Sequence, residues 1–188
     1  RWYAHELKEL GVEVRLNTKM TAQDIQKENF DVLILATGSS PKRIPLEGNV
    51  LTAEEVLLGK ADPGQSTVVV GGGLVGCETA LWLLALNGPL CHANSEMLEA
   101  LVPFKGVQVK CGSTVKSVES GKVVLAGKDG EETVNADSVI LCVGYRSENG
   151  LYEELKDQVD QIYQIGDANK VANIMYAIWD AYEVASTL

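Results

Sequence analysis

A glycine-rich segment that follows an apolar run constrains the fold of this chain more than any other feature. Residues 67–80 read TVVVGGGLVGCETA, and Gly71, Gly73 and Gly76 in this segment match the pattern G-x-G-x-x-G. The pattern is weak by itself, but here it joins a predicted buried strand to a predicted amphipathic helix, which is the context that gives it meaning. A strand, a tight glycine turn and a helix in this order are typical of a dinucleotide-binding α/β unit.

Each of the three glycines has a physical role in such a turn. Gly71 permits the tight turn, Gly73 lacks the Cβ that would block a pyrophosphate, and Gly76 lets the helix pack closely on the strand. The free N–H groups and the positive end of the helix dipole would then meet the two phosphates. The candidate phosphate-binding residues are Gly71, Gly72, Gly73, Leu74, Val75 and Gly76. The alternative is a turn that is merely rich in glycine.

One expected part of a dinucleotide-binding unit is absent after this helix. Such units continue with a second strand, whose terminal Asp or Glu binds the adenosine ribose about 20 residues beyond the glycines. No β-branched apolar run lies between this helix and the one predicted over 96–102. Glu96 lies 20 residues after Gly76, but the residues around it predict a helix over 96–102, which disfavours a role as ribose ligand. Our hypothesis is that a segment with the strand is missing between Gly88 and Pro89.

Three more apolar segments predict strands. Residues 31–36 and 138–143 are almost continuously apolar, which is typical of parallel strands covered on both faces, and 161–165 is a shorter candidate. Extended to 31–38 and 138–144, the first two segments both end in a glycine, Gly38 and Gly144. This similarity suggests two related nucleotide-binding modules, one of which interrupts the other.

The rest of the chain predicts helices and short strands. The helices cover residues 1–10, 76–87, 96–102 and 171–188, with short ones over 52–58 and within 17–29, where Thr21 is a candidate N-cap. One strand is predicted over 12–16, and short strands over 107–110, 114–118, 122–125 and 133–135 resemble an antiparallel meander. The expected fold class is α/β, a Rossmann-like three-layer dinucleotide-binding fold with a parallel sheet and a small antiparallel meander.

Composition and charge limit the classes of partner. The 188 residues are 46% apolar, which suits one sizeable globular domain or two small ones. With 16 basic and 26 acidic side chains the net charge is −10, which argues against nucleic acid as a partner, because binding to a phosphate backbone needs a basic face. No stretch approaches the roughly 20 apolar residues of a membrane-spanning helix, so we expect no membrane partner.

The cysteines and histidines form no catalytic or metal-binding pattern. The cysteines are Cys77, Cys91, Cys111 and Cys142. No two of them form a C-x-x-C pair, so neither a redox-active dithiol nor a metal site is predicted. Small buried thiols in a reducing compartment are the simplest interpretation, which implies a cytoplasmic location. His5 and His92 stand in no recognisable triad setting. The chain begins with Arg1 rather than Met, which suggests a fragment of a longer protein.

Four motifs together indicate a family. They are DVLILATGS at 31–39, TVVVGGGLVGCETA at 67–80, SVILCVGYR at 138–146 and IYQIGDA at 162–168. In this order they resemble the two-dinucleotide-domain flavoprotein reductases. The resemblance is greatest to the C-terminal part of NADH:flavin oxidoreductases of the 2,4-dienoyl-CoA reductase and old-yellow-enzyme type, which include bacterial NADH oxidases. It covers nearly the whole chain.

The resemblance implies an FAD domain that is interrupted by an NAD(P)H domain. Residues 1–50 and 146–188 would be the later parts of the FAD domain, 51–64 a connector, and 65–145 the NAD(P)H domain. The family's N-terminal barrel, with its FMN and an iron–sulfur cluster, would lie outside this chain, as would the first glycine loop of the FAD domain. We therefore expect the chain alone to bind FAD weakly.

The resemblance also assigns residues to FAD. Thr37 and Gly38 match the family's A-T-G segment near the flavin. Gly166 and Asp167 match the motif whose Asp accepts hydrogen bonds from the ribityl chain of FAD, and the helix that follows would point its dipole at the flavin ring. The alternative for Asp167 is a helix cap or turn residue after a strand.

For NAD(P)H, the resemblance assigns the pyrophosphate to Gly71–Gly76 and places Glu78 and Gly144 nearer the nicotinamide. Glu78 could equally be an acid of the first helical turn, where the helix dipole favours it. Trp179 and Tyr182 lie on the last helix and are interpreted as packing residues rather than as cofactor-stacking ones.

The implied activity is that of an NAD(P)H-dependent flavin oxidoreductase, of which this chain would be a part that is inactive alone. Hydride passes from the nicotinamide to the flavin and the protein aligns the two, so neither a catalytic side chain nor a metal is expected. An alternative is a non-catalytic NAD(P)- or nucleotide-binding regulatory module, which would have no use for a second, interrupted nucleotide domain. A disulfide reductase would need a dithiol near the flavin, and none is encoded.

Overall fold

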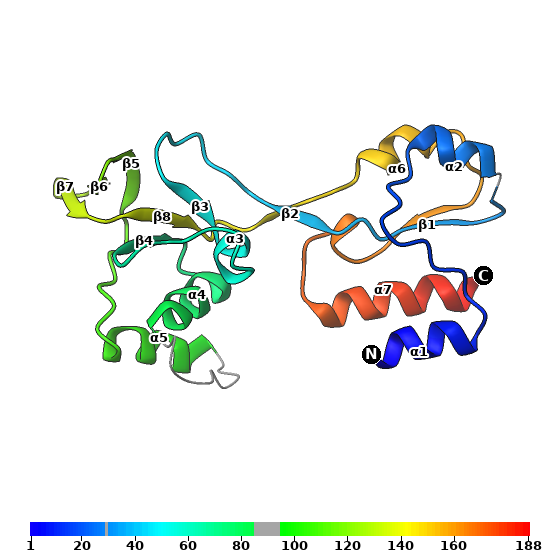
Figure 1. Ribbon diagram of the computed structural model, residues 1–188, viewed down its shortest axis with the longest axis horizontal. Helices are drawn as coiled ribbons and strands as arrows, with labels where there is room; N and C mark the ends of the chain where they lie inside the picture. Colours follow the sequence, from blue (N-terminus) through cyan, green and yellow to red (C-terminus); the bar gives the residue numbers. More distant parts are fainter. Residues whose placement is uncertain (29, 85–94) are drawn as a thin grey trace. The chain divides into compact units, whose positions relative to one another are not determined.

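The computed structural model describes residues 1–28, 30–84 and 95–188 (Figure 1). The chain divides into two compact units: unit 1 consists of residues 1–38 and 147–188, and unit 2 consists of residues 39–146. Unit 2 is therefore inserted into the sequence of unit 1. In the described parts of the chain, no helix combines the length and the apolar character that a membrane crossing needs.

The limits of the two units differ from the domain limits that the sequence suggests. The sequence analysis assigns residues 39–50 to the first domain and 51–64 to a connector, whereas the structure places both segments in unit 2. They contain a strand of its sheet and a helix packed on that sheet. Which cofactor each unit binds stays a prediction.

Unit 2 is built on a parallel sheet in the order β3-β8-β4. Its strands are β3 (Val50–Thr52), β4 (Thr67–Val70) and β8 (Ser138–Leu141). β8 is central, and its residues Val139 and Ile140 are completely buried, which explains the continuous apolar run of this segment. β4 is half-buried, because it is an edge strand among the described strands.

The two faces of this sheet carry different layers. On one face, Val139 and Leu141 pack against the antiparallel meander of β5 (Thr114–Glu119), β6 (Lys122–Gly127) and β7 (Gly130–Asn135). On the other face, Ile140 packs against α3 (Ala53–Leu57) and α4 (Leu74–Leu84). Meander, sheet and helices are three layers, so the predicted α/β fold with a parallel sheet and an antiparallel meander is confirmed.

The carboxylate of Asp137 holds the amino-terminal edge of this sheet. Its Oδ2 accepts the backbone N–H groups of Gln65 and Ser66, each at 2.9 Å. Its own N–H donates to the carbonyl of Ser66 at 2.6 Å. These bonds fix the register in which Thr67 pairs with Ser138.

The two helices that follow the glycine turn agree in part with those predicted from the sequence. α4 begins at Leu74, two residues earlier than expected, and α5 (Ser95–Phe104) confirms the helix predicted over 96–102. The predicted end of α4 and the proposed gap between Gly88 and Pro89 fall at 85–94, outside the described residues.

Unit 1 has a smaller core around two parallel strands. β1 (Leu33–Leu35) pairs with β10 (Ile162–Gln164), and α2 (Ala22–Glu28) and α6 (Gly150–Leu155) pack on them, burying Ile25 and Leu155 against Leu33 and Leu35. Its other elements are α1 (Trp2–Glu9), the 3-10 helix η1 (Gly166–Ala168) and α7 (Ile174–Thr187). A further two-stranded sheet, which pairs β2 (Ser39–Pro41) with β9 (Tyr145–Ser147), belongs to unit 2 except for its last residue, Ser147.

Two strands predicted from alternating apolar residues are wrong. Residues 12–16 and 107–110 have no strand structure. Val12 and Val14 are about half exposed, at 49% and 55%, and Val109 is 58% exposed. A strand needs a neighbour that takes up its backbone hydrogen bonds, and no described strand pairs with either segment.

The expected packing role of two large residues on α7 is also wrong. Trp179 is 55% and Tyr182 75% exposed. α7 instead turns small residues inward: Ala177 and Ala181 are half-buried, and a Cβ on Gly166 would lie 3.2 Å from that of Ala177. Small side chains let the helix approach η1 closely, so the larger ones point outward.

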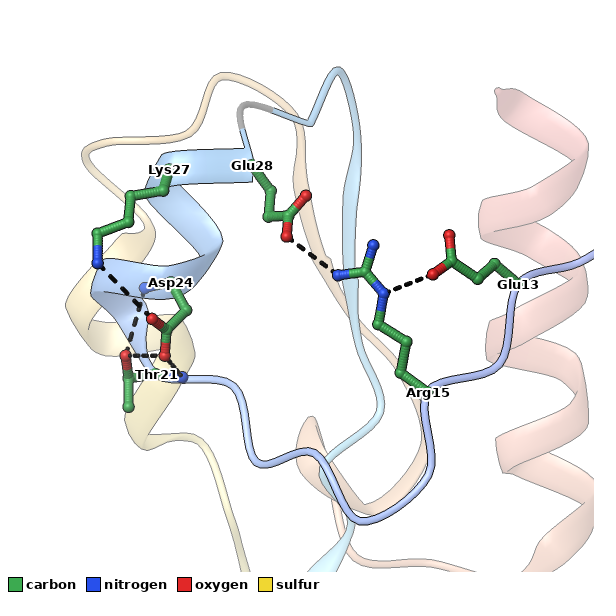
Figure 2. Close-up of polar contacts among 6 residues, drawn as sticks. All are labelled: Glu13, Arg15, Thr21, Asp24, Lys27 and Glu28. Atoms are coloured by element: carbon green, nitrogen blue, oxygen red, sulfur yellow. Dashed lines mark hydrogen bonds and ion pairs between the residues drawn. The ribbon is translucent and has the colours of Figure 1, made fainter.

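Figure 2 shows two groups of polar contacts in unit 1. Arg15 donates from Nε to Glu13 at 2.7 Å and from Nη1 to Glu28 at 3.0 Å, and these exposed ion pairs tie the chain ahead of α2 to that helix. At the start of α2, Thr21 Oγ1 donates to Asp24 Oδ2 at 2.6 Å and accepts the N–H of Asp24 at 3.3 Å. This reciprocal cap confirms Thr21 as the N-cap.

We expect the pKa of the Asp24 carboxyl to lie below its ordinary value of 3.8, mainly because the Thr21 hydroxyl donates to the carboxylate. The carboxylate therefore stabilises α2 fully above the unfolded-state pKa, and this stabilisation is lost as the pH falls through the lower folded-state pKa. An NMR titration of the carboxyl carbons measures the pKa directly. Thr21→Ala should return it toward 3.8, and Lys27→Ala, which removes an ammonium 3.9 Å away, should change it less. The reverse order would contradict this account of the cap.

Candidate functional site

The three glycines of the motif lie between a sheet strand and its helix. In Figure 1 the chain passes from β4 through the turn into α4. The Cys142 N–H donates to the carbonyl of Val70 at 2.8 Å, so the end of β4 stays paired with the segment that follows β8. The turn thus stands at the carboxyl edge of the sheet, where ligands bind in open α/β sheets.

Two of the glycines are required by packing. Gly71 has a φ of +117°, and a Cβ there would lie 2.3 Å from the carbonyl oxygen of Cys142. A Cβ on Gly76 would lie only 1.8 Å from the carbonyl oxygen of Gly71. Any side chain at either position would push α4 away from β4 or β8.

The third motif glycine, Gly73, and its neighbour Gly72 are not required by packing. A Cβ on Gly72 or Gly73 would meet no atom within 4 Å, and both residues are exposed. Space in front of Gly73, at the amino-terminal end of α4, is what a phosphate group would need to reach the backbone N–H groups. The turn therefore fits the diphosphate of a dinucleotide.

A pocket of about 250 Å³ opens beside this turn within unit 2. It is lined by Pro41, Ala53, Gly73, Leu74, Val75, Leu141, Cys142, Gly144 and Tyr145. Four of the predicted residues, Gly73, Leu74, Val75 and Gly144, are thus brought together. Glu78 is exposed on α4 and does not line this pocket.

The other lining residues were not found from the sequence. Cys142 and Tyr145 stand close to Gly144, whose position after a buried strand was the available signal. Pro41 and Ala53 come from a segment interpreted as connector and gave no signal. Burial raises the pKa of the Cys142 thiol, so it stays protonated near neutral pH and is a poor nucleophile.

In unit 1, the structure places the two predicted FAD segments at one sheet edge. Thr37 and Gly38 follow β1, and Gly166 and Asp167 follow β10, which is parallel to β1. The Thr37 hydroxyl donates to the carbonyl of Glu148, and the N–H of Glu148 donates to the carbonyl of Gly38 at 2.9 Å. Both turns therefore leave the carboxyl ends of paired parallel strands.

The turn that contains Gly166 and Asp167 is anchored by carboxylates. The Gly166 N–H donates to Asp180 Oδ2 on α7 at 3.1 Å, a contact that the sequence did not suggest. Asp167 Oδ1 accepts the N–H of Ala172 at 3.1 Å. The turn role weighed as an alternative for Asp167 is thus present in the structure, and its predicted role toward FAD stays a prediction.

Comparison with known proteins identifies the family. The model of the pyridine nucleotide-disulphide oxidoreductase family matches residues 21–181. The chain belongs to this family. Its membership confirms the predicted resemblance and the predicted cofactors, NAD(P)H and FAD, as those of the family.

Individual relatives agree with this family and are much longer than the chain. Cinnamate reductase of Clostridium sporogenes is 43% identical over 206 residues, which cover 100% of this chain and 31% of that protein. NADH oxidase of Thermoanaerobacter brockii is 31% identical, with 98% of this chain and 32% of that protein covered. A solved complex of 2-naphthoyl-CoA reductase with 2-naphthoyl-CoA matches with a TM-score of 0.85 and 25% identity, over 100% of this chain and 31% of that one. The chain thus spans about a third of the length of these relatives.

We expect alanine to destabilise the protein at Gly76 but hardly at Gly73, two glycines of the motif that joins β4 to α4. Gly76→Ala should lower the free energy of unfolding by about 1–3 kcal/mol or more, because its Cβ would overlap the Gly71 carbonyl. Gly73→Ala, in open space, should change it by less than about 0.5 kcal/mol. Urea unfolding followed by circular dichroism measures both. Equal destabilisation by the two substitutions would show that α4 does not approach β4 as described.

Proposed function

We propose that unit 2 binds NAD(P)H, that unit 1 contributes to an FAD site, and that the chain is the reductase part of a flavin-dependent oxidoreductase. The observation that carries the proposal is the turn between β4 and α4. Packing excludes side chains at Gly71 and Gly76, while the space before Gly73 stays open. Such a turn offers unobstructed backbone N–H groups at a helix N-terminus, which is a site for phosphates.

Each part of the chain has a defined task in this proposal. The N–H groups of the segment 71–76 bind the diphosphate of NAD(P)H, and Gly144 and Glu78 lie toward its nicotinamide half. Thr37–Gly38 and Gly166–Asp167 bind the flavin part of FAD. When both cofactors are bound, hydride passes from the nicotinamide to the flavin. The residues of this chain bind and orient the cofactors and exclude water.

The electrons then leave for a part of the protein outside these 188 residues. The greater length of the relatives supports this division of labour. We identify that part with an N-terminal barrel that carries FMN and an iron–sulfur cluster, and we assign the enzyme to the cytoplasm because its cysteines suit a reducing compartment. The segment missing between Gly88 and Pro89 stays a hypothesis. The match to cinnamate reductase extends over 206 residues against 188 in this chain, which is compatible with a missing segment.

A non-catalytic nucleotide-binding module is the competing function. It would use the glycine turn of unit 2 in the same way. The pair of parallel strands in unit 1, with Thr37–Gly38 and Gly166–Asp167 at their carboxyl ends, favours the reductase, because a nucleotide sensor needs no second site of this kind. Bound flavin that NADH bleaches distinguishes the reductase from the sensor.

Binding of NADH to the chain tests the proposal. Gly73→Ala should weaken binding about tenfold or more, because the added Cβ stands where the diphosphate approaches the backbone. Gly150→Ala is a matched control, since a Cβ there also meets no atom within 4 Å but lies in unit 1. Isothermal titration calorimetry measures the dissociation constants. If a folded Gly73→Ala variant bound NADH with unchanged affinity, the diphosphate would not bind at this turn.

A further inference from the structure

The pocket beside the glycine turn has one aromatic wall. Within the described part of the chain, Tyr145 is the only residue with an aromatic ring that lines it, and it is half-buried. The apolar side chains of Pro41, Leu74 and Val75 complete the wall. A volume of about 250 Å³ is below the roughly 300–1,000 Å³ of pockets that take a whole drug-sized ligand. The pocket therefore suits one ring of a dinucleotide.

The position of the pocket on the sheet indicates which ring this is. The order β3-β8-β4 places β8 on one side of β4, and the pocket lies on that side, with Ala53 after β3 and Leu141 at the end of β8. In a dinucleotide-binding sheet, the strand that carries the adenosine ribose ligand pairs with the opposite edge of the first strand. The half of the ligand that reaches this pocket is therefore the nicotinamide half.

The backbone that carries Tyr145 is held in place. Gly144 has a φ of +91°, which positions the turn into β9, and its carbonyl accepts the N–H of Lys42 at 2.9 Å. β9 pairs with β2, whose last residue, Pro41, is on the same pocket wall. A ring that is already positioned loses little conformational entropy when a ligand binds.

We infer that Tyr145 packs its ring against the nicotinamide ring of bound NAD(P)H and so determines affinity for the nicotinamide half of the ligand. This inference rests on the proposed binding of NAD(P)H by unit 2. Planar rings stack on aromatic side chains with a favourable free energy that is lost when the aromatic ring is removed. Tyr145 is in this account a binding residue, not a catalytic one.

Two ligands distinguish this contact from a general effect on the site. NADH carries the nicotinamide, and ADP-ribose has the same diphosphate and adenosine without it. In the 188-residue chain, Tyr145→Leu should weaken NADH binding roughly 5- to 100-fold and leave the affinity for ADP-ribose unchanged. Tyr145→Phe should bind both ligands as the unsubstituted chain does. Tyr182→Leu makes the same change on the exposed face of α7 and should affect neither affinity.

Calorimetric titrations of variants whose thermal unfolding matches that of the unsubstituted chain decide the matter. An unchanged NADH affinity in Tyr145→Leu overturns the inference and leaves the glycine turn in place. Equal losses of affinity for NADH and ADP-ribose also overturn it, because Tyr145 would then affect binding of the diphosphate at the glycine turn rather than binding of the nicotinamide ring. If Tyr145→Phe weakened NADH binding as much as Tyr145→Leu, the contact would be made by the hydroxyl group, and the inference of ring stacking would be wrong. An unsubstituted chain that binds neither ligand would overturn the proposed function itself.

Discussion

The approach of α4 to the end of β4 constrains the rest of unit 2. Only a hydrogen atom at Gly76 leaves room for the carbonyl of Gly71, and only a hydrogen atom at Gly71 leaves room for the carbonyl of Cys142. One turn therefore holds two strands and a helix together. The N–H groups at the start of α4 are fixed in front of open space, and oriented backbone dipoles of this kind stabilise a phosphate without a charged side chain. This explains how a chain with a net charge of −10 can carry a site for an anionic cofactor.

Unit 1 also has turns that contain glycine at the carboxyl ends of parallel strands. The backbone N–H of Glu148 donates to the carbonyl of Gly38 in one turn, and the carboxylate of Asp180 accepts the N–H of Gly166 in the other. Neither turn presents a general base or a nucleophile in a recognisable setting. The thiol that lines the pocket in unit 2, that of Cys142, has a raised pKa because of burial. Such a chain is suited to hold cofactors that carry the chemistry themselves.

Sequence patterns predicted the features that depend on local chemistry. The glycine spacing can be recognised in the sequence because steric exclusion acts on those residues themselves. The apolar run over 138–143 can be recognised because β8 is covered on both faces. Thr21 was found as an N-cap because the cap bonds a residue three positions away.

Features that depend on distant parts of the chain were missed. Alternation over 12–16 suggested a strand, but no described strand pairs with it. Trp179 and Tyr182 read as packing residues, whereas α7 turns alanines inward. The roles of Tyr145 and Asp180 depend on residues elsewhere in the chain. Tyr145 lines the same pocket as Leu74, and Asp180 accepts the N–H of Gly166.

The most direct test of the glycine turn is an NMR titration of the ¹⁵N-labelled chain with NADH. Backbone amides report their own contacts, so the turn is observed without any substitution. The account predicts the largest shifts at the amides of Gly72, Gly73 and Leu74, with Gly150 in unit 1 unaffected. Saturable NADH binding that leaves these three amides unshifted would contradict it.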